Sequence, residues 1–290
     1  MNYIGRFAPS PTGPLHFGSL VAALASFLDA RNAGGTWLLR IEDLDPPRES
    51  RAAPKEIMAQ LAALGLTWDN NVLYQSSRLL NYREVLQLLI EAGLVYPCIC
   101  TRKSVPPVYP GTCRGRKFSD AQNEHAIRLR VEAANIGFTD SVFGQKNWQI
   151  ADQIGDFIVR RKDGLFAYQL AVVIDDDFQG VTRIVRGADL LDSTPRQLAL
   201  YHALNLRPPA YLHIPILVDR SGDKLSKQTH AKPIDISDPV RLLRQALIAL
   251  GQDPQNGTAS LTYLLSRAIQ AWQIDRIPME IRLSAPPDYL

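Results

Sequence analysis

The sequence has little of what marks secreted or membrane-bound proteins. Its 290 residues include only three cysteines, an odd number that excludes a framework of paired disulfides. No apolar run is long enough to cross a bilayer, and the chain does not open with a basic segment followed by an apolar one. Neither a membrane span nor a secretory signal is expected, and we predict a cytoplasmic protein.

Charge of one sign is also scarce. The formal net charge is only +3 and the pI is about 8.7, which permits nucleic-acid binding but does not predict it. Hydrophobic residues make up 46% of the chain and charged residues 21%, as in ordinary globular proteins. The length is enough for one large domain or two modest ones with a sizeable core.

The N-terminal residues have the pattern of a strand, a rigid turn and a helix. Residues 3–7 form a short apolar run, and prolines and glycine over residues 9–14 then exclude regular structure. Apolar side chains recur at helical spacing over residues 17–28. His16 and Gly18 lie at the expected helix N-terminus, where free N–H groups and the helix dipole favour an anion such as phosphate. Taken alone, such a loop is more often only a connection.

A second strand is expected over residues 36–41. The chain would then begin with a strand–helix–strand unit, and its sheet should be parallel. Ligands of such sheets bind beyond the carboxyl ends of the strands, where Arg6, Ser10, Glu42 and Asp43 all fall. From the residues alone, a solvated strand end is the simpler interpretation of Glu42 and Asp43.

Periodicity predicts the remaining elements. We expect helices over residues 54–65, 77–93, 240–250 and 261–272, and strands over residues 127–131 and 156–161. The acidic run Asp175–Asp177 favours a solvated loop over a magnesium site.

The three cysteines are close together. Cys98, Cys100 and Cys113 lie within 16 residues, in a polar, proline-rich stretch with little apolar material to bury. A metal would stabilise such a stretch, and zinc is the natural ion in a reducing compartment. Three unrelated thiols are the alternative. Ligand statistics favour His125, the nearest histidine, as a fourth ligand.

Two separated motifs resemble the signatures of class I aminoacyl-tRNA synthetases. His16-Phe17-Gly18-Ser19 resembles the HIGH motif, and Lys224-Leu225-Ser226-Lys227-Gln228 resembles KMSKS. The wording of residues 6–13 is similar to that of glutamyl-tRNA synthetases in particular. The resemblance implies an α/β fold with a Rossmann-type parallel sheet, an inserted zinc-containing α+β subdomain and a C-terminal helical region.

The resemblance also implies a division of the chain. Residues 1–95 would form the first half of the catalytic fold and residues 96–150 the zinc-containing, acceptor-binding insertion. Residues 151–230 would form the second half with the KMSKS-like loop, and residues 231–290 a helical region that contacts the RNA stem. An anticodon-binding domain is not expected.

The family's functional residues map onto this sequence by motif. The residues implied to bind glutamate are Arg6, Phe7, Ala8, Pro9, Ser10, Glu42, Tyr168 and Arg186. The catalytic residues implied are His16, Gly18, Lys224 and Lys227, with His16, Gly18 and Lys227 also binding ATP and Mg²⁺ accompanying the nucleotide. One structural zinc is implied on Cys98, Cys100, Tyr109 and Cys113, with the tyrosine in place of His125.

A complete activation core without an anticodon reader resembles the glutamyl-Q tRNA(Asp) synthetases. The resemblance implies a ligase that forms a carbon–oxygen bond: it activates L-glutamate with ATP and attaches it to queuosine in tRNA(Asp). A monomer without membrane contact is expected. A truncated glutamyl-tRNA synthetase that charges a 3′ end, and a non-catalytic RNA- or amino-acid-binding paralogue, are the alternatives.

Overall fold

A parallel sheet begins the structure, as the sequence predicts. The computed structural model describes residues 2–120, 125–225, 231–255, 257 and 260–289. Strand β1 (Ile4–Phe7) leads through the turn into helix α1 (Phe17–Asn32), and β2 (Thr36–Ile41) then pairs parallel with β1. The short strand β3 (Leu73–Tyr74) pairs parallel with β2. The expected strand–helix–strand unit is therefore confirmed.

The second half of the parallel sheet lies on the other side of β1. Strands β9 (Arg183–Gly187) and β10 (Ala210–Ile214) are parallel, and the Thr182 amide, next to β9, donates to the Ile4 carbonyl oxygen over 2.9 Å. The strands thus lie in the order β3, β2, β1, β9, β10, and the direction of this order reverses between β1 and β9. Rossmann-type sheets bind ligands at such a reversal, beyond the carboxyl ends of the strands.

An antiparallel sheet forms the other end of the molecule. It consists of β4 (Val95–Cys98), β5 (Ala126–Leu129) and β8 (Phe157–Arg160), which include the strands expected near residues 127–131 and 156–161. The hairpin of β6 (Asn135–Asp140) and β7 (Gly144–Gln149) precedes the short helix α4 (Ile150–Gln153), and β6 joins the edge of β10.

The four helices predicted from periodicity are confirmed to within a few residues. They are α2 (Ala53–Ala63), α3 (Leu79–Glu91), α7 (Pro239–Ala249) and α8 (Leu261–Ala271). Helices α5 (Tyr168–Phe178) and α6 (Thr194–Ala203) and the parallel strands β11 (Ile216–Val218) and β12 (Arg282–Ser284) complete the regular elements. The 3₁₀ turns are η1 (Pro46–Arg48), η2 (Gln75–Arg78), η3 (Arg102–Ser104), η4 (Phe118–Asp120), η5 (Ala188–Ser193), η7 (Ile274–Arg276) and η8 (Pro287–Tyr289).

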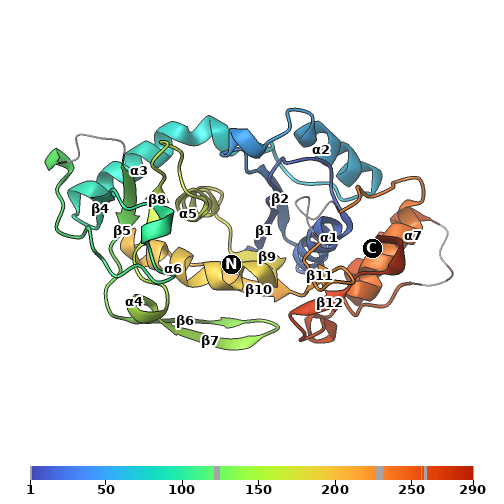
Figure 1. Ribbon diagram of the computed structural model, residues 1–290. Coiled ribbons are helices and arrows are strands. Elements are labelled where there is room, and N and C mark those ends of the chain that lie inside the picture. The colour runs from blue at the N-terminus through green and yellow to red at the C-terminus, as the bar shows by residue number, and fades with distance from the viewer. Residues whose placement is uncertain (1, 121–124, 226–230, 256, 258–259, 290) are drawn as a thin grey trace.

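Two large apolar clusters hold these elements together. One joins α1, β2 and α2 to the C-terminal helices α7 and α8, so the blue and red ends of the chain lie beside each other in Figure 1. The other joins α3, α5 and α6 to β5 and β8. Polar contacts at Asp29 support the first cluster, since its carboxylate accepts from Tyr3, Arg183 and Trp272. No helix in the described part of the chain is long and apolar enough to cross a membrane.

The acidic run Asp175–Asp177 corrects one expectation. It lies in α5 rather than in a solvated loop, and Asp175 and Asp176 are buried. The Asp175 carboxylate accepts from Gln75, Arg78 and Tyr82, so both of its oxygens already have protein partners. The run failed as a loop signal because buried arginines on other elements neutralise its charge, which the sequence pattern does not show.

Candidate active site

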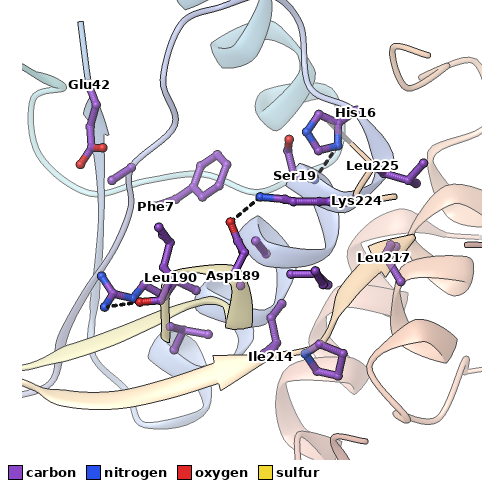
Figure 2. Close-up of a pocket in the computed structure, with 18 of the residues that line it drawn as sticks. Phe7, His16, Ser19, Glu42, Asp189, Leu190, Ile214, Leu217, Lys224 and Leu225 are labelled. Carbon is purple, nitrogen blue, oxygen red and sulfur yellow. Dashed lines mark hydrogen bonds and ion pairs between the residues drawn. The ribbon is translucent and has the colours of Figure 1, made fainter. Parts of the chain in front are cut away.

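A cavity opens where the strand order reverses. It lies beyond the carboxyl ends of β1 and β9 and reaches the N-terminus of α1, with Glu42 near one side and His16 near the other (Figure 2). Most of the residues predicted for the site line it: Arg6, Phe7, Ala8, His16, Gly18, Glu42, Tyr168, Arg186 and Lys224. Pro9 and Ser10 are not among its lining residues, although the Pro9 carbonyl accepts the Glu42 amide and so fixes the end of β2.

Arg186 is a buried cation whose described partners are all neutral. It stands near the end of β9 and is only 5% exposed. Its Nε donates to His213 Nε2 over 3.0 Å, and its terminal nitrogens donate to Gln197 Oε1 and Thr194 Oγ1, both over 2.8 Å. Across the described residues, no carboxylate forms an ion pair with it. A buried charge without a counter-ion is costly, so the site favours an anionic ligand next to this guanidinium.

His213 and Asp140 hold Arg186 in place from behind. Asp140 accepts from His213 Nδ1 over 2.7 Å and from the His213 amide over 3.0 Å. Because Nδ1 donates to Asp140, Nε2 is left as the acceptor that Arg186 requires, and the imidazole is neutral. Burial, opposed by the hydrogen bond to Asp140, lowers the pKa of His213, which keeps it in this neutral form. Sequence reasoning missed both residues, because nothing near either of them marks a site.

A balanced charge cluster forms another part of the cavity wall. Arg6 Nε and Nη2 donate to the two oxygens of Asp176, over 3.0 and 3.4 Å. Arg40 donates to Asp176 over 2.8 Å and to Glu42 over 3.2 Å. Two guanidinium groups therefore face two carboxylates, so this wall is neutral, unlike the surroundings of Arg186. Burial raises the pKa of Glu42, although Arg40 and Arg6 oppose the shift.

Tyr168 lines the cavity together with both of its arginines. It is the first residue of α5 and lines the cavity with Arg6 and Arg186. Burial raises the pKa of its phenol, so the hydroxyl keeps its proton and remains a donor. The site thus presents a neutral hydroxyl donor and a guanidinium whose described partners are neutral, a set of donors suited to a carboxylate.

The N-terminus of α1 lies at the other side of the cavity. His16 caps this helix: its Nδ1 accepts the Ser19 amide over 3.2 Å, as Figure 2 shows. A neutral imidazole that accepts at Nδ1 carries its proton on Nε2, which makes Nε2 a donor. A Cβ on Gly18 would lie 3.3 Å from two atoms of the His16 ring, so glycine permits the ring its position.

Lys224 enters the cavity from the loop after β11. Its Nζ donates to Asp189 Oδ2 over 2.5 Å, and the pair is partly exposed (Figure 2). Asp189 belongs to η5, directly after Arg186 and Gly187, and sequence reasoning did not single it out. Lys227, the second predicted lysine of the motif, lies outside the described residues.

The three cysteines form a compact cluster that fits a tetrahedral metal. Their sulfur atoms all lie within 4.8 Å of one another, and Cys100 and Cys113 are 3.6 Å apart. The hydroxyl oxygen of Tyr109 is 3.5 Å from the sulfurs of both Cys98 and Cys100. Zinc–sulfur bonds of about 2.3 Å place two sulfurs of a tetrahedral site about 3.8 Å apart, so these spacings match such an ion.

The Tyr109 hydroxyl lies beside the three sulfurs, whereas His125 does not. Among the described residues, no histidine belongs to the cluster, and His125 lines a different cavity, where its ring contacts Phe118. Arg128 supports the cluster, because its Nε donates to Cys98 Sγ over 3.2 Å and its guanidinium stacks on the Tyr109 ring. Burial raises the pKa of Cys113, but hydrogen bonds from Tyr109 and the Ile99 backbone bring it down to about 7.

Comparisons with known proteins agree with this geometry. The family described as class I tRNA synthetases (E and Q), catalytic domain, matches residues 4–106 and 113–252, and the interval between the two segments contains Tyr109. The glutamyl-Q tRNA(Asp) synthetase of Pseudomonas fluorescens is 50% identical over 282 residues, covering 96% of this chain and 94% of that protein. The protein of the same name from Chromobacterium violaceum is 50% identical over 285 residues, covering 95% of each chain.

A solved structure shares the fold at lower identity. The glutamate tRNA ligase from Elizabethkingia meningosepticum, solved with its amino acid, superposes with a TM-score of 0.82 at 22% identity. The match covers 98% of this chain and 68% of that one. At this identity the likeness concerns the fold, and it agrees with the Rossmann-type sheet described above.

Proposed function

Because the chain belongs to the class I tRNA synthetases for glutamate and glutamine, and among them to the glutamyl-Q tRNA(Asp) synthetases, we propose that it joins L-glutamate to queuosine in tRNA(Asp). ATP first activates the glutamate, and the glutamyl group then passes to the modified base in the anticodon loop. The protein is a ligase that forms a carbon–oxygen bond.

The observation that carries this proposal is the buried cation Arg186, which has no carboxylate partner among the described residues. A glutamate side chain supplies one negative charge, and Arg186 together with the Tyr168 hydroxyl can hold it. The α-amino and α-carboxylate groups cancel each other, and they meet the neutral cluster of Arg6, Arg40, Asp176 and Glu42. Charge therefore balances group by group. Glutamine would leave the Arg186 charge unmatched, which favours glutamate.

Activation joins the α-carboxylate of glutamate to the α-phosphorus of ATP. A new P–O bond forms as the bond to the β-phosphate breaks and pyrophosphate leaves. The enzyme supplies no covalent nucleophile, so positioning and charge stabilisation perform the catalysis. We assign the Nε2 donor of His16 to the phosphates, with Gly18 leaving room for the nucleotide. Lys224 and Lys227 would neutralise the charge that develops, and Mg²⁺ bound with ATP would add further positive charge.

Transfer needs no further catalytic group. A hydroxyl of the acceptor attacks the carbonyl carbon of the mixed anhydride, the ester forms, and AMP leaves. For queuosine to be the acceptor, the anticodon loop must enter the cavity. We propose that the insertion over residues 96–150 and the helices over residues 231–290 hold the anticodon stem through phosphate contacts, which position the RNA without reading its sequence.

The cysteine cluster would hold one structural zinc ion. Cys98, Cys100, Tyr109 and Cys113 supply four ligands, which leaves no open position for substrate. When bound, the ion would fix the loop between β4 and β5, on the side of the molecule that the proposed RNA contacts use.

Two measurements test the proposal. Glutamate-dependent exchange of pyrophosphate into ATP should occur, and its absence with and without tRNA would leave a non-catalytic paralogue. Glutamate transfer should persist when the 3′-terminal adenosine of tRNA(Asp) is removed, and should vanish with tRNA(Asp) that lacks queuosine. The opposite pair of results would identify a glutamyl-tRNA synthetase that charges the 3′ end.

A further inference from the structure

A second cavity is lined by residues that directly follow Glu42 in the sequence. Glu42 lines the first cavity, and its neighbours Asp43 and Leu44 line the second. The second cavity has a volume of about 600 Å³, within the range of ligand sites in proteins. It lies between α3 and the sheet of β5 and β8, at the end of the molecule away from the C-terminus (Figure 1).

Charged groups of both signs line this cavity, and its carboxylates and arginines differ in their partners. Both oxygens of Asp43 accept from Ser76, and Asp163 accepts from Arg161 and from the Leu165 amide. The two arginines of the cavity, Arg83 on α3 and Arg160 at the end of β8, form no ion pair with any carboxylate that the structure describes. Two cations thus face a space whose carboxylates already have partners.

Aromatic rings and an apolar floor complete the cavity. Phe118 and His125 line it, with their ring centroids 6.0 Å apart and their planes inclined at 62°. The buried side chains of Leu86, Ile127 and Phe166 form its floor. Aromatic rings with guanidinium groups and apolar surface are what proteins use to hold an unpaired base and its phosphate.

We propose that this cavity binds the nucleotide next to the one that receives glutamate. The base would stack against Phe118 and His125, and its phosphate would contact Arg83 and Arg160. This inference rests on the proposed function, because the acceptor must be a base in a single-stranded loop for its neighbour to lie here. Because Glu42 lines the glutamate pocket and Asp43 lines the second cavity, a loop that brings one nucleotide to the first would bring the adjacent one to the second.

The first test separates base from phosphate contacts by direct binding. Binding of fluorescein-labelled tRNA(Asp) that carries queuosine is measured by anisotropy at several salt concentrations, for Arg83→Ala, Phe118→Ala and the wild type. We expect each variant to bind about fivefold to a hundredfold more weakly. Arg83→Ala should also reduce the slope of log K against log salt by about 0.7, whereas Phe118→Ala should leave the slope unchanged.

Arg207→Ala is the matched control. Arg207 is an exposed arginine just before β10, at the amino-terminal edge of the sheet and away from both cavities. The Arg207→Ala variant should bind the RNA as tightly as the wild type does. If Arg83→Ala weakens binding no more than Arg207→Ala does, the site is not an RNA subsite and the proposal is overturned.

A second test ties the cavity to the transfer step. Pyrophosphate exchange without RNA should be the same in the wild type, Arg83→Ala and Phe118→Ala, while kcat/KM for the RNA in glutamate transfer falls about tenfold or more. Loss of exchange in a folded variant would place the cavity in the activation site and overturn the proposal. A wild type that shows no exchange either with or without tRNA would refute the proposed function instead, and the binding measurement would still decide the subsite.

The position of the nucleotide can be read directly. A 4-thiouridine placed beside the queuosine should crosslink on irradiation to a peptide that contains Phe118 or His125. Crosslinking of that nucleotide only to peptides outside the cavity would contradict the assignment.

Discussion

The cysteine cluster and the glutamate pocket are both built from buried polar groups, but over very different lengths of chain. The four groups of the cluster lie between Cys98 and Cys113. In the pocket, Arg6 meets Asp176 across 170 positions, and His213 meets Asp140 across 73. The cluster is a local loop that a bound ion would fix, whereas the pocket is fixed by the packing of the whole sheet.

This difference determines what the removal of one side chain would change in each region. In the cluster, removal of one group would cost the ion and the order of one loop. In the pocket, the described partners of Arg186 are all neutral, so removal of one group changes the charge balance of a desolvated site. The comparison predicts large functional effects from the pocket and mainly stability effects from the cluster.

The largest effect should come from Arg186→Gln. This change removes the only cation proposed to face the side-chain carboxylate, and the loss of one partner from such a pair costs about 2–5 kcal/mol. We expect kcat/KM for glutamate in pyrophosphate exchange to fall by the matching factor, roughly 30-fold to several thousandfold. Arg183→Gln is the control, because Arg183 lies on the same strand but pairs with Asp29 at its other end. Near wild-type kinetics for Arg186→Gln would show that Arg186 does not bind the side-chain carboxylate of glutamate.

The cluster should respond in stability and metal content. Cys113→Ser is expected to lower zinc from one ion per chain to nearly none after dialysis, and the unfolding temperature by about 5 °C. Pyrophosphate exchange should change far less than in Arg186→Gln, because the cluster does not line the glutamate pocket. Zinc analysis, thermal unfolding and exchange on the same samples check this.

The fourth ligand can be decided with a matched pair. Tyr109→Phe removes one oxygen beside the sulfurs, and His125→Ala removes the alternative ligand from its separate cavity. We expect weaker zinc binding in Tyr109→Phe and wild-type binding in His125→Ala, measured by competition with a chelator. The reverse order would make the histidine the ligand.

A smaller effect is expected from His213→Gln, which keeps an acceptor for Arg186. We predict a rise of about tenfold in KM for glutamate, with KM for ATP unchanged.

The pKa of His213 is lowered in the folded protein, so its contribution to stability is present above its unfolded pKa of about 6.5 and is lost as pH falls through the lowered value. Glutamate binding should weaken over the same interval, since an imidazolium cannot accept from Arg186. In His213→Gln, neither KM for glutamate nor the free energy of unfolding, measured with denaturant, should show this change at low pH.

The smallest effect should come from Asp189→Asn. The ion pair of Asp189 with Lys224 is partly exposed, with the lysine side chain 44% accessible, and such pairs contribute at most about 1 kcal/mol. We expect less than about a fivefold change in KM for ATP and no change in KM for glutamate. A loss as large as that of Arg186→Gln would show that this pair belongs to the fixed part of the pocket.

Much of the fold could be predicted from sequence because its signals are local. The apolar run at β1, the glycine- and proline-rich turn and the spacing in α1 each concern neighbouring residues, and the structure confirms all three. The same locality made the cysteine cluster visible. The acidic run in α5 was misread because its counter-ions come from β1, β2 and the turn before α3.

Only those residues of the candidate site that belong to a motif could be predicted from the sequence. Motifs singled out Arg6, Glu42, Tyr168 and Arg186, and the structure brings all four around one cavity. Their roles stay predictions. The residues that hold them could not be found, since Asp140 reaches His213 only because a hairpin joins the edge of β10. No pattern along the chain records which strand edge a hairpin will join.

The hydrogen bonds at Asp29 have a consequence for how the chain acquires its structure. Trp272 donates to Asp29 across 243 positions, and the same carboxylate also receives Arg183 from β9. On the ribosome, the first apolar cluster can therefore close only after Trp272 has been synthesised. Until then, the apolar face of α1 that packs against α7 and α8 remains exposed. Such distant contacts fold slowly and leave apolar surface open to chaperones during synthesis.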